Sequence, residues 1–352
     1  MPEDFQSPDI DFIVAGEGVS IFSEIIARLE NGLDVTGIPG SVRLENGAVL
    51  IKQGEDGIDL DAFPFPRRDL TSKYRKYYGS EWMRPLASIR TSKGCHFRCR
   101  FCALWKLAGG RYLVRKPERI VEELKTIREK YVFFSDDESL LDVRRMEKLA
   151  DMIEQEGIRK RYFLYGRSDT VSRNPGLIEK WKKIGLERVF VGLEFFRDDD
   201  LKLIKKGSSV ENNIKAVQVL KGLGLDIFPM FIVRPDFTKK DFDDLRKFCL
   251  SLDLDFIGFS VLTPLPGTDL YGEVKDDLIT SNYDYFDFFH THLRTTLPLK
   301  DFYKELIRLY NRSRSIRGQL RFLRKFPLRE LPAAFKVFSR FLKRLKQLEA
   351  DY

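Results

Sequence analysis

The sequence predicts an α/β fold in which a partial, open (β/α)6 barrel of TIM-like form carries a short N-terminal α/β segment and a helical C-terminal extension. Strand patterns and helix patterns alternate between about Leu86 and Leu270. Regular alternation of this kind predicts a parallel sheet with right-handed crossovers. Six such units are too few for a closed eightfold barrel, so we expect an open one with its site at the C-terminal ends of the strands.

Each predicted element has a local signal. Pro117 is typical of a helix start, and Gly157, Gly185 and Gly224 are typical of positions just after a helix end. The predicted strands cover residues 87–92, 131–135, 161–168, 188–196, 226–233 and 255–267. The predicted helices cover residues 117–130, 143–156, 176–184, 212–223 and 239–252.

Two flanking regions complete the predicted organisation. The N-terminal region contains a strand, a helix and a hairpin-like stretch with Asn46-Gly47 at its turn, followed by a Pro-rich linker. The C-terminal region is helical and basic. We therefore predict three parts: residues 1–84, a core of residues 85–297, and an extension of residues 298–352.

Composition narrows the class of protein. Hydrophobic residues make up 43% and charged residues 32% of the 352, an ordinary globular balance. We find no run of 18 apolar residues, and the acidic, polar start does not resemble a signal peptide. We expect a cytoplasmic protein. Four cysteines are too few for a disulfide scaffold, and three of them are clustered, which favours metal binding.

The clustered cysteines are Cys95, Cys99 and Cys102, spaced C-x3-C-x2-C. Thiolates are soft ligands that suit iron–sulfur clusters, and three of them leave one iron of a cubane open to a small molecule. A structural zinc ion would need a fourth ligand, and His96 is poorly placed to supply it. Cys249 lies in an amphipathic helical pattern, so we expect it to be a core residue.

Charged groups follow two of the predicted strands. Asp136, Asp137 and Glu138 end the second strand, and because three adjacent acids repel one another, a cation or a donor should face them. They also suit a helix N-terminus. Arg167 and Ser168 end the third strand, where the guanidinium could bind a ligand carboxylate or form an ordinary ion pair with these acids.

An acid also interrupts an apolar strand. Glu194 lies in the fourth strand, and burying it is costly without a partner. Gly192 would let the backbone approach a ligand closely. Structural roles for both residues stay open. Pro264 belongs to a Pro-rich exit from the sixth strand, which is either an ordinary turn or part of a ligand site.

The cysteine loop resembles the signature of the radical S-adenosylmethionine (SAM) superfamily, in which C-x3-C-x2-C follows the first barrel strand. The resemblance covers about residues 85–275. It implies a 4Fe–4S cluster on the three cysteines, whose open iron binds SAM, and reductive cleavage of SAM to a deoxyadenosyl radical that abstracts hydrogen from substrate. It also implies contacts to SAM: Phe101 and Pro264 near adenine, Asp136, Asp137 or Glu138 at the amino group, and Glu194 at the ribose.

A narrower resemblance concerns one subfamily. Residues 10–32 and 38–50 resemble the closing strand and helix of the cobalamin-binding domain that precedes the radical SAM domain in that subfamily. Residues 286–310 resemble its hopanoid methylase-like members. The resemblance implies that many members of the subfamily transfer methyl groups and that others cyclise or rearrange their substrates. A complete domain needs roughly 100 residues before Gly16-Glu17-Gly18, including a histidine loop. We therefore expect that this chain does not bind cobalamin tightly.

The positive charge is concentrated in the C-terminal region. The chain has a net charge of +8, and residues 312–352 hold 12 Lys and Arg against 3 Asp and Glu. Within it, residues 333–348 form a basic amphipathic helix that could lie on an anionic membrane surface, making the protein peripheral to the membrane, or pack on the barrel. The apolar face of this helix consists of Phe335, Phe338, Phe341, Leu342, Leu345 and Leu348.

The predicted partners are a small-molecule or lipid-like substrate and a reductant such as flavodoxin or ferredoxin. No nucleic-acid partner is expected, because no aromatic and basic stacking surface is evident in the body of the sequence. Two alternatives to an enzyme stay open: a non-catalytic iron–sulfur protein for electron transfer or sensing, and a degenerate partner-binding subunit. An electron carrier usually closes its cluster with four cysteines, so the three-cysteine loop favours the enzyme.

Overall fold

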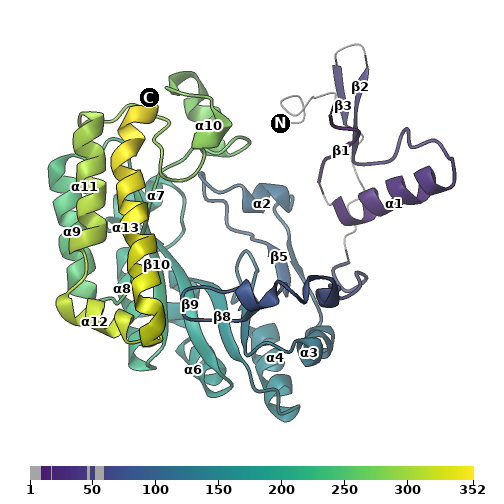
Figure 1. Cartoon of the computed structure of the whole chain (residues 1–352), viewed down its shortest axis with the longest axis horizontal. Helices are drawn as coiled ribbons and strands as arrows, with labels where there is room; N and C mark the ends of the chain where they lie inside the picture. Colours follow the sequence, from purple (N-terminus) through teal and green to yellow (C-terminus); the bar gives the residue numbers. More distant parts are fainter. Residues whose placement is uncertain (1–8, 17, 46–47, 52–58) are drawn as a thin grey trace. The chain divides into compact units, whose positions relative to one another are not determined.

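The fold is described from a computed structural model that covers all residues except 1–8, 17, 46–47 and 52–58. The chain forms two compact units, Met1–Asp59 and Leu60–Tyr352 (Figure 1). The larger unit contains the predicted α/β core, the cysteine loop and the C-terminal helices.

A six-stranded parallel sheet organises the larger unit, in the order β11-β10-β9-β8-β7-β4. Its strands follow one another in sequence across the sheet, as right-handed βα repetition requires. The sheet is curled as a partial barrel, which confirms the predicted fold class. Its strands are β4 (Leu86–Ile89), β7 (Tyr131–Phe134), β8 (Arg161–Arg167), β9 (Leu186–Glu194), β10 (Asp226–Val233) and β11 (Gly258–Val261).

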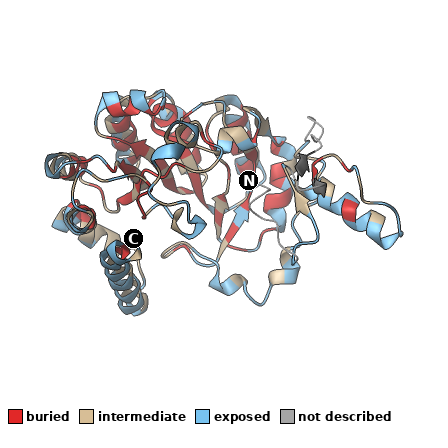
Figure 2. Cartoon of the chain, turned by 90° about the horizontal axis from the view of Figure 1, so that it is seen from above, coloured by how far each residue is buried: buried red, intermediate tan, exposed pale blue. Residues whose placement is uncertain are grey.

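Helices cover the outer face of this sheet, and Figure 2 shows their buried sides turned toward the strands. Side-chain caps fix several starts: Asp142 accepts from the Arg145 amide, and Thr238 forms a capping box with Asp241. The covering helices are α3 (Pro117–Thr126), α4 (Val143–Gln155), α6 (Pro175–Lys183), α8 (Val210–Gly222) and α9 (Lys239–Leu252). Shorter helices, α5 (Ser168–Arg173) and α7 (Asp198–Leu203), follow β8 and β9.

The first predicted strand differs from the observed one. β4 ends at Ile89, and the chain then leaves the sheet to form β5 (Ser92–Gly94), which pairs antiparallel with β6 (Tyr112–Val114). The Asp136 carboxylate accepts hydrogen bonds from the amides of Thr91 and Ser92, so these amides are diverted from a sheet ladder. The cysteine loop and the short helix α2 (Leu104–Leu107) lie between β5 and β6.

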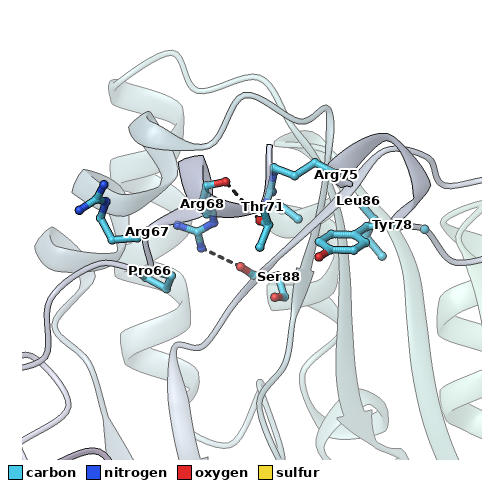
Figure 3. A pocket seen from close by; sticks show the side chains of 10 residues that line it. Pro66, Arg67, Arg68, Thr71, Arg75, Tyr78, Leu86 and Ser88 are labelled. Atoms are coloured by element: carbon cyan, nitrogen blue, oxygen red, sulfur yellow. Dashed lines mark hydrogen bonds between the residues drawn. The ribbon is translucent and has the colours of Figure 1, made fainter. Parts of the chain in front are cut away.

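The two strands that end the sheet have their outer backbone groups occupied. Along β4, the Leu86 amide donates to the carbonyl of Tyr78, and the Arg68 guanidinium donates to the carbonyl of Ser88. Along β11, the Phe259 amide donates to the Tyr310 hydroxyl, which donates back to the Phe259 carbonyl. Figure 3 shows the segment beside β4, where residues 66–79 and the strand line a cavity of about 400 Å³.

The C-terminal extension forms α11 (Leu299–Arg312), α12 (Ile316–Leu323) and α13 (Leu331–Gln347). The second half of α13 packs on the body: Leu345 is 1% exposed, and the Phe341 ring lies 5.0 Å from that of Tyr310. Phe335, in the first half, is 55% exposed. Most of the predicted apolar face is therefore occupied by packing. Among the described residues, no helix is long and apolar enough to cross a membrane.

In its described residues, the smaller unit contains an antiparallel sheet of three short strands, in the order β1-β2-β3, and one helix. The predicted hairpin is present, and its Asn46-Gly47 turn lies outside the described residues. Ile25 of the helix is fully buried. The elements are β1 (Ile13–Val14), α1 (Gly18–Glu30), β2 (Ser41–Glu45) and β3 (Ala48–Ile51).

Candidate functional site

The cysteine loop is fixed by its own backbone and by its neighbours. Cys99 is buried, whereas Cys95 and Cys102 are half-buried. The carbonyl of Cys99 accepts from the Cys102 amide at 3.1 Å and from the Trp105 indole at 3.1 Å. Burial raises the pKa of Cys95 to about 11 and also raises that of Cys102. These groups are therefore thiols at neutral pH unless a bound metal stabilises the thiolates.

The loop fits an iron–sulfur cluster better than a single ion. Among the described residues, no three His, Cys, Asp or Glu side chains are arranged to hold one metal ion. His96 lies against Phe97, with ring centroids 4.6 Å apart. A structural zinc ion needs four ligands around one point, whereas a cubane spreads its thiolates over separate irons. The fourth cysteine, Cys249, is fully buried in the core on α9, as predicted.

Two of the three adjacent acids anchor the segment before the cysteines. Asp136 accepts from the amides of Thr91 and Ser92 at 2.6 and 2.8 Å, and Asp137 accepts from the Gly94 amide at 2.6 Å. Donors do face these acids, but most of them belong to the backbone that leads into the loop. The side chains of Asp136 and Asp137 are thus already engaged.

Glu138 differs from its two neighbours. It is 3% exposed, and the only hydrogen bond that described residues donate to its carboxylate comes from the Leu140 amide at 3.3 Å. Burial raises the pKa of Glu138 to about 8, against the opposing charges of Arg167 and Lys206. A buried carboxyl with one weak donor has unused hydrogen-bonding capacity. Of the three acids, Glu138 is the one still available to a ligand.

Arg167 connects the cysteine loop to the end of β8. Its Nη1 lies 4.0 Å from the Cys99 Sγ, and its guanidinium carbon lies 3.4 Å from the centre of the Phe97 ring. Its Nε donates to Asp169 at 2.9 Å, and its Nη2 donates to the Lys206 carbonyl at 2.5 Å. The buried guanidinium of Arg167 therefore contacts the cysteine loop, the start of α5 and the turn that contains Lys206. The ion pair of Arg167 is with Asp169 and not with the acids after β7, and its contacts also hold the cysteine loop in place.

A buried ion pair lies at the end of β9. The Lys206 Nζ is 2.6 Å from the Glu194 Oε1, and Lys206 is 6% exposed. Burial is the largest influence on Lys206 and opposes its charged form, but the charge and hydrogen bond of Glu194 together with the charge of Cys99 leave the pKa of Lys206 raised. Glu194 has a left-handed φ of 62°, and a Cβ on Gly192 would lie 2.3 Å from the Glu194 Oε1. A side chain at position 192 would therefore displace the pair from this arrangement.

Sequence reasoning missed Lys206. It follows Lys205 and precedes Gly207, so it looks like an exposed loop lysine. Only its partner, an acid embedded in a strand, indicated that a buried cation was needed somewhere. That cation is Lys206, which lies 12 residues downstream of Glu194 and is brought to it by the fold of the intervening chain.

The remaining predicted residues lie around this group. Ser168 is buried, and its hydroxyl is 3.1 Å from that of Ser208. Phe101 is half-buried and packs against the core. Pro264 is buried after β11, and the segment that follows it bonds to the cysteine loop through the Leu270 amide and the Arg100 carbonyl, at 2.9 Å.

Comparison with known proteins identifies the family. A sequence model described as the Radical SAM superfamily matches residues 89–249. The chain is 33% identical over 299 residues to a hopanoid C-3 methylase from Methylococcus capsulatus, covering 85% of this chain and 57% of that protein. It is 31% identical over 310 residues to an uncharacterised methyltransferase from Pyrococcus horikoshii, covering 86% of this chain and 66% of that protein.

Solved structures show the same fold. A cobalamin-dependent SAM radical enzyme, OxsB, with aqua-cobalamin and SAM bound, aligns with a TM-score of 0.70 at 16% identity and covers 96% of this chain and 55% of that one. The radical SAM methyltransferase TsrM from Kitasatospora setae aligns with a TM-score of 0.59 at 19% identity, over 75% of this chain and 53% of that one.

The cysteine loop at the end of the first strand of a partial barrel, together with these matches, defines the class. The chain belongs to the radical SAM superfamily. Within it, the chain is similar to proteins named as methylases, methyltransferases and cyclases. It spans between about half and two thirds of the length of the first curated relatives that it matches.

Proposed function

We propose that this chain holds a 4Fe–4S cluster on Cys95, Cys99 and Cys102 and uses it with SAM to functionalise an unactivated C–H position. The observation that carries the proposal is a loop with three cysteine thiols, one of which lies 4.0 Å from the Arg167 guanidinium, near the buried Glu194–Lys206 pair and a buried carboxyl with one weak donor. One iron would thus remain for SAM.

Cys95, Cys99 and Cys102 would hold the cluster, which would supply the one-electron reducing chemistry needed to cleave SAM and to activate a C–H bond of the substrate. The protein's part is to hold and shield the reacting groups. Arg167, 4.0 Å from the Cys99 Sγ, would offset thiolate charge and keep the loop in place. The electron would come from a reductant such as flavodoxin or ferredoxin.

SAM would lie across the ends of β7, β8 and β9. Glu138 would accept from its amino group, because this carboxyl has capacity that Asp136 and Asp137 have already used. Glu194 would accept from ribose hydroxyls while Lys206 contacts its Oε1. The other proposed contacts are Phe101, Arg167, Ser168, Gly192 and Pro264.

The substrate would be a small or lipid-like molecule, and methyl transfer is the reaction that the names of the relatives favour. A hopanoid methylase and several methyltransferases are among these relatives. Where a methyl group is transferred, a second SAM molecule or another methyl donor must supply it.

Anaerobic reconstitution followed by reduction tests the proposal. We expect about four irons and four sulfides per chain, and deoxyadenosine from SAM after reduction. Ala at Cys95, Cys99 or Cys102 should abolish deoxyadenosine formation. Cys249→Ala is the matched control, because that thiol is buried in the core and should leave iron content and turnover unchanged. One tightly bound zinc ion without sulfide would contradict the proposal.

A further inference from the structure

The turn from α12 into α13 carries an excess of positive charge. We call residues 316–340 the elbow; it comprises α12, a short connection and the first half of α13, and Figure 1 shows α12 beside the start of α13. The elbow contains seven Lys and Arg residues against one acid, Glu330. Its sequence therefore gives this short segment a strongly positive local charge.

The cations of the elbow fall into two groups. Arg321 and Lys325 both pair with Asp255, at 2.6 and 2.9 Å, and so face the barrel. The other five are exposed, and none of them forms an ion pair with any residue that the structure describes. Exposed cations elsewhere commonly have such a partner, as Lys240 has in Asp244, so the outer charge of the elbow is unusual in not being neutralised locally. The five unpaired cations are Arg317, Arg324, Arg329, Lys336 and Arg340.

Large apolar side chains are exposed on the same segment. Leu328 is 83% exposed and Ile316 is 77% exposed, the two highest values for large hydrophobic side chains among the described residues. Leu320 and Phe335 are also exposed. Ile316, Leu328 and Phe335 are each followed in sequence by one of the five unpaired cations. Exposed apolar side chains and unpaired positive charges are therefore interspersed in the elbow.

The packing of α12 determines which of its sides faces outward. Gly318 is buried, and a Cβ at this position would lie 2.5 Å from a backbone carbonyl oxygen. Phe322, four residues later, packs on Trp82, with ring centroids 5.9 Å apart. Residues four apart lie on one side of a helix, so this side is held against the body. Ile316 and Leu320 are also four apart and lie on the opposite side, because a step of two residues turns about 200° around the helix.

An anionic lipid surface fits this combination better than other acidic partners do. Aliphatic side chains can enter the headgroup boundary of a bilayer while adjacent cations meet the anionic headgroups. Single-stranded nucleic acid is bound through stacking on aromatic rings, and the two most exposed apolar side chains of the elbow are aliphatic. The core of a protein interface is depleted of charged residues, whereas Ile316 and Leu328 each have an unpaired Arg beside them in sequence.

The elbow is distinct from most of the apolar face that the sequence predicted for α13. Phe341, Leu345 and Leu348 of that face pack on the body, so their insertion into lipid would require α13 to detach. Of that face, Phe335 remains exposed and belongs to the elbow. The exposed side chains of the elbow can meet a lipid surface without any rearrangement of the fold.

We propose that the elbow attaches the protein peripherally to an anionic lipid bilayer. Ile316 and Leu328 enter the headgroup boundary, and the five unpaired cations contact the anionic headgroups. The inference does not depend on the proposed function. Lys325 of the elbow pairs with Asp226, the first residue of β10, whereas the cysteine loop follows the end of β4. Attachment and cluster chemistry therefore belong to different ends of the strands and can be measured separately.

Co-sedimentation of the full chain with vesicles tests the inference. We expect binding to vesicles of phosphatidylglycerol and phosphatidylcholine in equal parts, none to phosphatidylcholine alone, and weaker binding as added salt screens the charges. Arg317→Gln with Arg324→Gln should weaken binding at least about tenfold, because each cation near an anionic surface contributes about fivefold. Ile316→Ser with Leu328→Ser keeps the charge and should also weaken binding at least about tenfold, because it removes the inserted apolar area.

Two double variants are the matched controls. Lys183→Gln with Lys240→Gln removes two exposed positive charges elsewhere. Leu70→Ser with Leu107→Ser removes two apolar side chains that are each 72% exposed. Both controls should bind the anionic vesicles as the wild type does. All four variants should keep the wild-type midpoint of thermal unfolding, because every changed side chain is exposed.

Several results would overturn the inference. They are absence of binding to the anionic vesicles at low salt, and an equal loss of binding in either control. A loss in the glutamine variant without one in the serine variant also overturns it, because the elbow would then bind an anion without entering a bilayer. Duplex DNA and polyglutamate are the soluble polyanions for comparison, and binding of either that is as tight as vesicle binding assigns the elbow to that class of partner instead. If a double variant does not fold, the single changes Arg317→Gln and Leu328→Ser decide.

Discussion

Among single residues, Asp136, Asp137 and Glu138 show how position decides role. All three follow β7, yet two of them bind backbone amides of the segment before the cysteines, and the third keeps a nearly free carboxyl. The sequence predicted that cations or donors would face this group. It could not predict which acid stays available, because the donors come from residues more than 40 positions earlier.

Glu138 should make the stability of the metal-free protein depend on pH. An unfolded Glu titrates near pH 4.5, whereas this buried carboxyl keeps its proton up to about pH 8. Between these values the native state binds more protons than the unfolded state, so stability falls as pH rises, by up to about 1.4 kcal/mol per unit. Glu138→Gln should remove this slope. Parallel urea-denaturation profiles for wild type and variant between pH 5.5 and 7.5 would contradict the assignment.

The ion pair of Glu194 and Lys206 predicts that the effects of mutating the two residues on the free energy of unfolding are not additive in a double-mutant cycle. Lys206→Met leaves a buried carboxylate without its partner and should lower the free energy of unfolding by about 3–5 kcal/mol. Adding Glu194→Gln should restore much of that loss. SAM affinity should fall by about 1.5–3 kcal/mol in Glu194→Gln and stay low in the double variant, as measured by calorimetry. Additive stability losses, or full SAM affinity in the double variant, would argue against the pairing and the ribose contact.

For secondary structure elements, apolar periodicity was enough to predict all six strands and the five long helices. The ends were set by tertiary contacts. β4 stops early because Asp136 binds the following amides, and α3 stops at Thr126, short of the predicted Lys130. Both faces of these strands carry apolar side chains, so the sequence could not show which face of the sheet the helices cover.

The helix α13 offers a test at this scale. Leu345→Ala should lower the free energy of unfolding by about 2–5 kcal/mol, because its side chain is buried against the body. Phe335→Ala, on the exposed half, should change it by less than about 0.5 kcal/mol. Thermal and chemical denaturation measure both. Salt-sensitive binding of wild type to anionic vesicles, lost in Phe341→Glu without loss of stability, would instead support the membrane-surface role predicted for the apolar face of this helix.

For the whole molecule, the division into two units predicts that the larger one is self-sufficient. Residues 60–352 contain every proposed ligand of the cluster and of SAM, together with nearly all buried apolar side chains. A chain that begins at Leu60 should therefore unfold cooperatively and accept about four irons on reconstitution. Denaturation curves and iron analysis decide. A preparation that is soluble but lacks cooperative unfolding would show that the smaller unit is needed for folding.

A barrel that stops at six strands has two edge strands, β4 and β11. The contacts made by their outer backbone groups affect how the protein behaves in concentrated solution. Exposed strand margins serve as templates on which a second polypeptide can add a strand. Here Tyr78 and Arg68 form hydrogen bonds to the backbone of β4, and Tyr310 forms hydrogen bonds to the backbone of β11. The backbone groups of Leu86, Ser88 and Phe259 that are engaged in this way cannot pair with a strand from a neighbouring chain.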